Sequence, residues 1–370
     1  MGLFYVRFKR MHILHLIYDH MQNPWVGGGG AVRAYELNKR LAKRGHRVLT
    51  VSGNYPGAMD YEEENLAFKF MGSAGSYLSS TFSYALNAAG FVKKHGRKFD
   101  MIVEDFAPWN PLFSKFLTKK PVILIVHHKE GAGILKRRNF LGLPFYLIEK
   151  AYPKFFPRVI AVSEETKRKF GLPGAKVILA GIDEELMPRE PLPEEERGDY
   201  VLFMGRLHIK NKGIDTLLEA MKKIPETRFV VLGRGPDEER VKEMAKGLRV
   251  EFMGFLKDMK KIELLRRAKL FLFPSRFEGF GIAALEAGAA GTPVIASDIP
   301  ELSFVRDGGF GLSFRKGDPD DLAQKINALL KDHSLRAQMG RKGIEFAREC
   351  TWEKRAAEYE KYLLENSLSQ

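Results

Sequence analysis

The sequence predicts an α/β protein built from two Rossmann-like, doubly wound domains. Short apolar runs of strand length alternate with longer amphipathic stretches, which is typical of parallel sheets covered by helices on both faces. The alternation occurs in two series, separated by a segment rich in proline and glutamate. A chain of 370 residues is also longer than one compact core usually requires, so two domains are expected.

The first series defines an N-terminal domain over residues 1–187. A helix is expected over Ala31–Arg44, directly after a run of glycines. The expected strands of this domain are Ile13–Tyr18, Arg47–Ser52, Met101–Glu104, Val122–His127 and Val159–Val162.

The second series defines a C-terminal domain over residues 188–350. It follows a linker, Met187–Asp199, whose prolines disfavour regular structure. An amphipathic helix over Thr351–Asn366 ends the chain and could lie across either domain. A return to the first domain would add residues 351–370 to that domain. The expected strands are Tyr200–Met204, Arg228–Leu232, Arg249–Met253, Leu270–Pro274 and Pro293–Ala296, and the expected helices are Asp215–Lys223, Glu238–Lys246, Met259–Ala268 and Gly281–Ala290.

The formal charge of +14 is concentrated in the first half of the chain. Residues 1–190 carry 29 Lys and Arg against 17 Asp and Glu, whereas residues 191–370 carry 31 against 29. A one-sided excess favours attraction to an anionic partner, either a phospholipid surface or a phosphorylated acceptor. Solvated surface charge is the alternative interpretation, and nucleic acid is not the expected partner.

Nothing in the sequence predicts secretion or a membrane span. No apolar run approaches the roughly 18 to 20 residues that cross a bilayer. Met1–Arg10 lacks the apolar stretch of a cleavable signal and could be an extension before the first strand. The single cysteine, Cys350, forms neither an internal disulfide nor a cysteine-rich metal site. We expect a cytoplasmic protein, peripheral at the inner face of the membrane if its basic half meets lipid.

The first candidate for binding chemistry is the run Gly27–Gly30, between the opening strand and its helix. Gly28 and Gly29 would let backbone N–H groups and a helix N-terminus approach a phosphate or sugar closely. The run lacks the spacing of a dinucleotide fingerprint, and a flexible turn is the alternative interpretation.

The second candidate is the loop that follows the Tyr200–Met204 strand and contains Gly205, Arg206 and Lys212. Ligands of open α/β sheets bind at the carboxyl ends of strands. Two fixed cations there could hold a diphosphate and neutralise the charge that grows on it as it leaves. A pair of solvated loop residues is the alternative.

The third candidate is Pro274–Ala287, where a strand end, a glycine-bearing turn and a helix follow one another. Amides around Gly279, Phe280 and Gly281 could bind phosphate at the helix N-terminus. Glu286 lies in an otherwise apolar helix and needs a partner, which could be a ribose diol or a structural salt bridge.

The spacing of two glutamates in this segment argues against a hydrolase. Glu278 and Glu286 are eight residues apart, which is about 12 Å along a helix. Paired glycosidase carboxylates lie about 5 to 9.5 Å apart. The pair therefore favours binding of different parts of one extended ligand.

Two further patterns concern histidine and metal. His127 ends a strand, where it could reach a substrate hydroxyl or be purely structural. No third ligand lies near His127–His128 in the sequence, so no metal site is expected there. Asp318-Pro319-Asp320 superficially resembles a metal-binding Asp-x-Asp, but it predicts the capped start of a surface helix.

Together these segments resemble glycosyltransferase family 4, the retaining enzymes of the GT-B architecture. The resemblance covers nearly the whole chain from Met11 and departs from the family pattern at Ala180–Asp183, where Asn-Gly is common, and at His128, where aspartate is common. The matching segments are the glycine loop, Leu41–Ala42 with Gly45–Val48, His127, Ala161–Ser163, Gly205–Leu207 with Lys212–Gly213, and the glutamates at 278 and 286.

For the second domain, the resemblance implies a nucleotide-sugar site. Arg206 and Lys212 would hold the leaving diphosphate, and Glu286 would bind the ribose. Glu278 and the amides of Phe280–Gly281 would face the sugar and phosphate. Base recognition is expected near Gly254-Phe255-Leu256, with Phe255 as a donor contact.

For the basic first domain, we expect acceptor binding across a cleft from the donor. By the resemblance, His127 would lie beside the donor sugar, whereas His46 matches the family but is interpreted as a structural residue. The resemblance thus implies retention of anomeric configuration. Together with the motifs it predicts a metal-independent hexosyltransferase that needs no cofactor and moves a sugar from a nucleoside-diphosphate sugar to a hydroxyl acceptor.

Two rival functions stay open at this point. One is another GT-B enzyme, such as a nucleotide-sugar epimerase or a sugar phosphorylase. The other is a non-catalytic basic protein that binds membrane or nucleic acid, which the one-sided charge fits equally well but the ordered loops do not.

Overall fold

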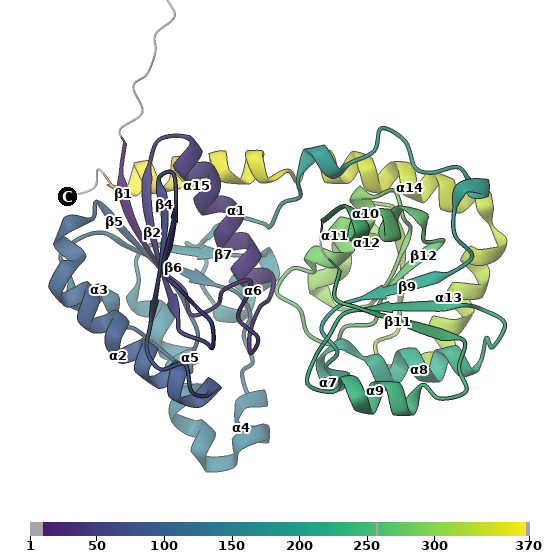
Figure 1. Ribbon diagram of the computed structural model, residues 1–370, viewed down its shortest axis with the longest axis horizontal. Coiled ribbons are helices and arrows are strands. Elements are labelled where there is room, and N and C mark those ends of the chain that lie inside the picture. Colours follow the sequence, from purple (N-terminus) through teal and green to yellow (C-terminus); the bar gives the residue numbers. More distant parts are fainter. Residues whose placement is uncertain (1–9, 257, 368–370) are drawn as a thin grey trace, which may run out of the picture. The chain divides into compact units, whose positions relative to one another are not determined.

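The computed structural model describes residues 10–256 and 258–367, which form two compact units (Figure 1). The first unit contains the chain up to Ala180 and the segment from Trp352, and the second contains Gly181–Thr351. The division therefore falls before the boundary expected after Met187, and the intervening residues belong to the second unit. Of the predicted N-terminal extension, only Arg10 lies within the described residues.

The first unit is built on an eight-stranded sheet in the order β3-β4-β2-β1-β5-β6-β7-β8. All neighbouring strands are parallel except β3 and β4. The strands are β1 (His12–Leu16), β2 (Arg47–Gly53), β3 (Tyr61–Glu63), β4 (Leu66–Met71), β5 (Met101–Asp105), β6 (Val122–Val126), β7 (Val159–Ala161) and β8 (Lys176–Val177).

Helices cover both faces of this sheet because successive strand side chains alternate between the faces. Leu14 and Leu16 pack on the side of α2, whereas His15 lies on the side of α1. The helices and 3-10 turns are α1 (Gly29–Lys43), α2 (Tyr77–His95), η1 (Gly96–Lys98), α3 (Ser114–Leu117), α4 (Gly133–Arg138), η2 (Asn139–Gly142), α5 (Leu143–Ala151), η3 (Tyr152–Phe155), α6 (Glu164–Phe170) and α15 (Trp352–Ser367).

The C-terminal helix α15 returns to the first unit and packs beside α1 (Figure 1). Glu360 of α15 accepts hydrogen bonds from Arg44 at 2.6 Å and from His46 at 2.9 Å. The other ring nitrogen of His46 accepts the Met11 N–H at 3.1 Å. His46 thus joins β1 to α15, which confirms its predicted structural role.

The second unit is built on a six-stranded, fully parallel sheet in the order β11-β10-β9-β12-β13-β14. The strands are β9 (Val201–Met204), β10 (Phe229–Leu232), β11 (Val250–Gly254), β12 (Leu270–Phe273), β13 (Val294–Ser297) and β14 (Gly311–Phe314). The helices and 3-10 turns are η4 (Glu184–Leu186), η5 (Glu194–Glu196), α7 (Ile209–Lys212), α8 (Ile214–Lys222), α9 (Glu238–Met244), α10 (Asp258–Arg267), α11 (Ile282–Ala289), η6 (Pro300–Leu302), α12 (Ser303–Asp307), α13 (Pro319–Lys331) and α14 (His333–Arg348).

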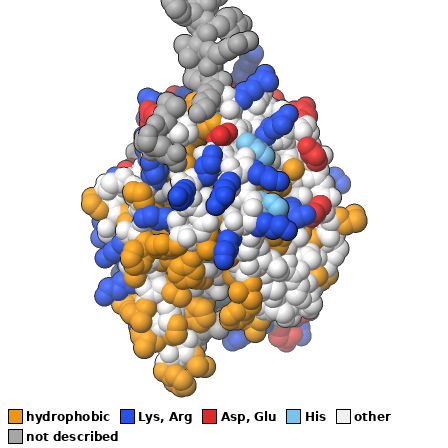
Figure 2. All heavy atoms as spheres, turned by 90° about the vertical axis from the view of Figure 1, so that its left-hand side faces the viewer, with side chains coloured by type: hydrophobic (Ala, Val, Ile, Leu, Met, Phe, Trp, Pro, Cys, Tyr) orange, Lys and Arg blue, Asp and Glu red, His pale blue; other side chains and the backbone are white. Residues whose placement is uncertain are grey.

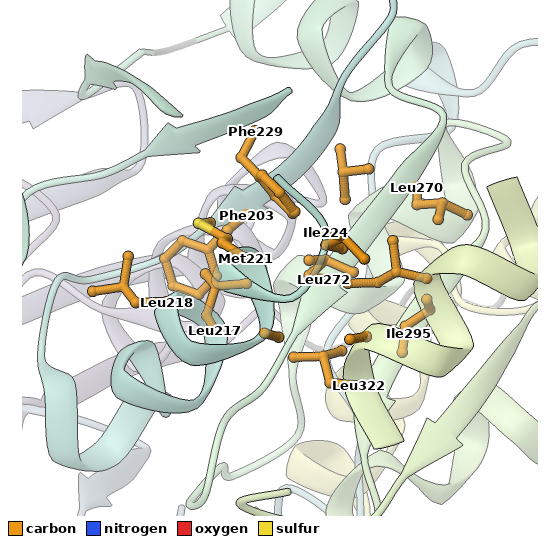
Figure 3. Packing of buried hydrophobic residues seen from close by; sticks show 14 of the residues in the cluster. Phe203, Leu217, Leu218, Met221, Ile224, Phe229, Leu270, Leu272, Ile295 and Leu322 are labelled. Atoms are coloured by element: carbon orange, nitrogen blue, oxygen red, sulfur yellow. The ribbon is translucent and has the colours of Figure 1, made fainter. Parts of the chain in front are cut away.

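Two apolar layers hold the second sheet in place. On one face α8 and α13 pack against alternate strand residues, as Figure 3 shows for Leu217, Met221 and Leu322 around Phe203 and Leu272. On the other face α10 and α11 pack against the remaining strand residues. Since both faces of the central strands β9, β10, β12 and β13 are buried, these strands are continuous apolar runs, which is why the sequence predicts them well.

The structure adds elements that the sequence analysis did not predict, namely β3, β4, β8 and β14. Of these, β3, β8 and β14 are short and lie at sheet edges, and β4 lies next to the edge strand β3 and is only partly buried, so their apolar pattern is weaker. Within the described residues, no helix is both long and apolar enough to cross a bilayer.

Candidate active site

The loops that follow β9, β10, β11 and β12 meet at one edge of the second sheet, because all of these strands are parallel. Arg206 and Lys212 follow β9, Phe255 follows β11, and Glu278 with Gly281 follows β12. Residues predicted from widely separated segments are therefore brought to a single carboxyl edge.

The loops after β9 and β12 approach so closely that a glycine is required between them. Gly213 has a φ of +63°, and a Cβ on it would lie 2.1 Å from the Pro274 carbonyl oxygen. The Arg276 N–H donates to the Asn211 carbonyl oxygen at 2.8 Å. This backbone packing fixes Lys212 next to the turn that carries Glu278.

Lys212 and Glu278 form a half-buried ion pair. The Lys212 Nζ lies 2.5 Å from the Glu278 Oε1, and the two side chains are 21% and 11% exposed. The same ammonium group lies 5.5 Å from the centre of the Phe273 ring. These contacts hold the positive charge in one position, where it can attract a phosphate without reorganising.

The N-terminus of α11 faces the same edge. Gly281 precedes the helix with a φ of +91°, and a Cβ on it would lie 2.5 Å from the Leu302 Cδ2. Phe280 stacks on Phe304, with ring centres 5.0 Å apart. No acidic side chain lies in the first turn of α11, so its amides and helix dipole favour an anion.

Glu286 lies on α11, and its Oε1 accepts a hydrogen bond from the Lys261 Nζ at 2.7 Å. The ion pair was one of the two partners predicted for this carboxylate. The side chains of Lys261 and Glu286 are 25% and 19% exposed, so the carboxylate stays within reach of a ligand. Ribose binding by Glu286 stays a prediction.

Arg234, which follows β10 at this edge, was not among the residues predicted from the sequence. Gly233 has a φ of +145°, and a Cβ on it would lie 1.9 Å from the Gly205 carbonyl oxygen. The guanidinium of Arg234 extends toward Gly254, whose Cβ position would lie 3.8 Å from the Arg234 Nε. The signal was present in the sequence, because Gly233-Arg234 follows a strand as Gly205-Arg206 does.

In the first unit, the glycine run lies beside His127. A Cβ on Gly30 would lie 3.4 Å from the His127 Cε1 and 3.8 Å from the Asp19 Oδ2. The helix α1 begins at Gly29 and not at Ala31, so the second half of the run is its first turn. Gly28, the residue before the helix, has space on its Cβ side.

The buried carboxylate of Asp105 joins two histidines on neighbouring strands. His127, which follows β6, and His15 on β1 both donate to Asp105 at the end of β5, the latter at 2.5 Å. The other ring nitrogen of His15 lies against the Asn38 side-chain amide, 2.8 Å from its nitrogen and 3.0 Å from its oxygen. Although burial favours protonation of Asp105, the charges and hydrogen bonds of His127 and His15 hold its pKa well below the ordinary value.

The adjacent residue Glu104 points to the opposite face of the sheet, and its pKa is shifted in the opposite direction from that of Asp105. Its carboxylate accepts hydrogen bonds from Ser114 and from the Tyr152 hydroxyl, the latter at 2.7 Å. Complete burial raises the pKa of Glu104 despite these bonds. Glu104 holds the α3 loop in place, whereas Asp105 positions His127.

The sequence has His128 where the family commonly has aspartate, and the structure shows that Asp105 is the carboxylate that pairs with the neighbouring His127. His128 is exposed, with its Nε2 3.9 Å from the Glu130 Oε1. The carboxylate partner of His127 comes from another strand, Asp105 on β5, and not from the neighbouring position in the sequence. The sequence contains Asp105 at a strand end, but its pairing depends on the order of strands in the sheet.

The acidic Asp318–Asp320 segment caps a helix as predicted. The Asp318 carboxylate accepts the N–H groups of Asp320 and Asp321 at 3.0 Å each, at the start of α13. Across residues 10–256 and 258–367, no cluster of three or more His, Cys, Asp or Glu side chains could hold a metal ion.

The chain thus consists of two α/β domains, each with polar loop residues at the carboxyl edge of a largely parallel sheet. Two sequence profiles match the chain: Glycosyltransferase Family 4 over residues 27–186, and Glycosyl transferases group 1 over residues 184–346. An uncharacterised glycosyltransferase of Methanocaldococcus jannaschii is 31% identical over 350 residues, which cover 85% of this chain and 88% of that protein.

A partial match and two solved structures agree with these profiles. The phosphatidyl-myo-inositol mannosyltransferase of Mycobacterium leprae is 37% identical over 163 residues, which cover 42% of this chain and 43% of that protein. The sucrose-phosphate synthase of Thermosynechococcus elongatus has the same fold, with a TM-score of 0.80 at 23% identity over 95% of this chain and 98% of that one. Anabaena HepE in complex with UDP-glucose has a TM-score of 0.70 at 19% identity, over 95% of this chain and 99% of that one.

The chain belongs to the family 4, group 1 glycosyltransferases, and its two parallel-sheet domains have the GT-B fold.

Proposed function

We propose that this glycosyltransferase moves a sugar, with retention of anomeric configuration, from a nucleoside-diphosphate sugar to an acceptor hydroxyl. The observation that carries the proposal is the carboxyl edge of the second sheet, where Lys212 and Arg206 lie on the loop beside the α11 N-terminus. Two cations and a set of amides suit a diphosphate better than a neutral ligand. Anabaena HepE, a structural neighbour, was solved with UDP-glucose bound.

The reaction forms a bond between the acceptor oxygen and the anomeric carbon and breaks the bond from that carbon to the diphosphate oxygen. Negative charge grows on the diphosphate, where Arg206 and Lys212 stabilise it. The departing phosphate oxygen takes the acceptor's proton, so no separate protein base is needed. Because the hydroxyl attacks from the face that the diphosphate leaves, the configuration is retained.

We assign acceptor binding to the first unit, where His127 can hydrogen-bond a sugar or acceptor hydroxyl. Asp105 keeps the His127 ring oriented, and Gly28–Gly30 leaves room for a ligand beside it. We place the reaction in the cytoplasm, at the inner face of a membrane that the basic first half attracts.

Metal independence is part of the proposal, because fixed cations can supply the charge that a divalent ion would otherwise provide. Full turnover should persist after the enzyme and buffers are treated with EDTA. A loss of turnover that Mg²⁺ or Mn²⁺ restores would contradict this part and leave the donor site unaffected.

The donor site is tested by a thermal-shift panel of UDP, GDP and ADP with their sugars. A bound nucleotide raises the melting temperature, and Arg206→Ala should abolish that rise. The preferred donor should stay unchanged without an acceptor, whereas its conversion to an epimer would contradict transfer. Proton NMR of the product gives the anomeric configuration, and inversion would overturn the retaining mechanism.

A further inference from the structure

Helix α2 of the first unit is apolar on two opposite faces. Its inward face contains Tyr84 and Ala88, which are buried against the sheet. Its outward face contains Leu78, Phe82 and Leu86, which are 58%, 62% and 76% exposed. These three lie four residues apart and therefore form one stripe along the helix. From Tyr77 to Val92 the helix contains no charged residue, whereas a surface helix ordinarily has a polar outer face.

The exposed apolar surface continues beyond α2. Helix α3 packs against α2, and its Phe116 lies 6.0 Å from Phe155 of η3, ring centre to ring centre. The Lys115 ammonium donates to the Phe155 carbonyl oxygen, which ties α3 to η3. Leu147 of α5, which packs against η3, is 52% exposed. We name this surface the apolar face: Leu78, Phe82, Leu86, Phe116, Leu147 and Phe155.

Basic side chains border the apolar face, and acidic ones are missing from α2, η1 and α3. Lys93, Lys94, Arg97 and Lys98 are exposed at the end of α2 and in η1. The sequence has no Asp or Glu between residues 77 and 99 or between 106 and 129. Figure 2 views the protein from the left-hand side of Figure 1. It shows hydrophobic side chains gathered over one broad area, with a band of Lys and Arg beside it.

We propose that the apolar face and its basic border dock on a bilayer that contains anionic lipids. An exposed apolar area of this kind marks an interaction site. Apolar side chains can enter the headgroup boundary while neighbouring lysines meet lipid phosphates. A second copy of the chain fits less well, because pairing through this face would bring two basic borders together.

Helix α2, which carries much of the apolar face, begins near the sheet edge where we assign acceptor binding. Tyr77, the first residue of α2, lies 6.0 Å from Tyr18, ring centre to ring centre. Tyr18 follows β1 and precedes Asp19, which lies at the carboxyl edge beside Gly30. Docking would thus bring lipid to the edge where we assign acceptor binding. This link rests on the proposed function, whereas the docking itself does not.

The test is flotation of the full-length protein with vesicles of phosphatidylcholine, with or without phosphatidylglycerol. We expect binding to the anionic vesicles alone, weakened by salt. The triple variant L78S/F82S/L86S should bind at least about tenfold more weakly, since three apolar side chains no longer enter the boundary. Neutralising Lys93 and Lys94 with glutamine should weaken binding by about fivefold for each charge.

Matched controls separate this surface from general hydrophobicity and charge. Met59→Ser removes an exposed apolar side chain outside the apolar face, and K242Q/K246Q removes two charges from the second unit. Both controls should bind vesicles as the wild type does. Nucleotide-induced thermal shifts should be unchanged in the triple variant, which checks folding and separates lipid docking from donor binding.

Unchanged vesicle binding by the triple variant would overturn the proposal, as would wild-type protein that does not bind anionic vesicles. A stable dimer that the triple variant dissociates would assign the apolar face to self-association instead. Salt-sensitive binding of RNA that K93Q/K94Q abolishes, without vesicle binding, would assign the basic border to nucleic acid.

Discussion

The carboxyl edges of the two sheets have the same architecture and different chemistry. In the first unit, a buried aspartate joins two histidines, and its side chain is 5% exposed. In the second unit, lysine–glutamate pairs are only partly buried and lie beside a helix N-terminus. Parallel strands bring loops together in both cases, but the residues that follow each strand differ, and on this difference we base the proposal of a hydroxyl ligand at one edge and a phosphate at the other.

The largest expected effect concerns the carboxyl edge of the second sheet, where we propose that the diphosphate binds. Lys212→Ala should lower kcat by about 10²- to 10³-fold, because a preorganised charge next to the leaving group is lost. Steady-state kinetics measure the loss, and circular dichroism checks the fold. Lys210→Ala changes an exposed lysine of the same helical turn and should have little effect.

Glu278 needs its own control, since removal of Lys212 leaves this carboxylate without its ion pair. The double variant Lys212→Ala/Glu278→Gln removes the unpaired charge and should still transfer slowly. Wild-type turnover in the single lysine variant would contradict the assignment of Lys212 to the leaving group.

The second prediction concerns the carboxyl edge of the first sheet, where we propose that the acceptor hydroxyl binds. Asp105→Asn keeps the size of the side chain but removes the charge that orients His127, so we expect kcat to fall by about 10²-fold. Nucleotide affinity, measured by calorimetry, should stay the same because Asp105 belongs to the first unit. The control His128→Asn alters an exposed histidine and should be neutral.

A loss of nucleotide affinity in Asp105→Asn as large as its fall in kcat would remove the distinction between the two edges. A fall in kcat for His128→Asn as large as for Asp105→Asn would show that the orientation of His127 is not the cause.

The third prediction concerns Glu286 and the ribose. Glu286→Gln should weaken nucleotide binding by about tenfold, because a charged hydrogen bond becomes neutral. The wild type should prefer UDP, or whichever nucleotide the panel selects, over its 2′,3′-dideoxy form, and the variant should lose this preference. Glu263→Gln changes an exposed glutamate of α10 and serves as the control. If Glu286→Gln kept the preference for the nucleotide with ribose hydroxyls, Glu286 would be only a structural partner of Lys261.

The smallest effect is a pH dependence of stability in the first unit. Burial lowers the pKa of His20 to about 4, and its Nδ1 accepts from the Tyr55 hydroxyl at 2.9 Å. The unfolded chain, with a histidine pKa of about 6.5, binds more protons between these values. Stability is therefore fully present above about pH 6.5 and lost as the pH falls toward 4.

His20→Gln should reduce this acid-induced loss by about 1–2 kcal/mol, measured by urea unfolding at pH 7 and pH 4.5. His333→Gln changes an exposed histidine and should leave the loss unchanged. An identical pH dependence in the His20 variant would contradict the burial argument.

Sequence alone predicts the buried strands and the second site because each depends on local pattern. Strands such as β6 are continuous apolar runs, and the glycines and cations that follow β9 and β12 stand next to them in the chain. The family resemblance, the two parallel-sheet domains and the return of the final helix to the first unit are confirmed.

The missed features depend on neighbours that are distant in sequence. Asp105 meets His15 and His127 only because β5 lies between β1 and β6. The outward stripe of α2 has the same apolar pattern as a buried helix face, so its exposure is not visible in the sequence. Arg234 is different, because its glycine-flanked position after a strand could have identified it.

The most direct test of the account is a crystal structure with the nucleoside diphosphate that the thermal-shift panel selects. We expect phosphate oxygens about 2.7–3.2 Å from the Lys212 ammonium, the Arg206 guanidinium and amides at the start of α11. Phosphates bound away from the second sheet, in contact with none of these groups, would contradict it.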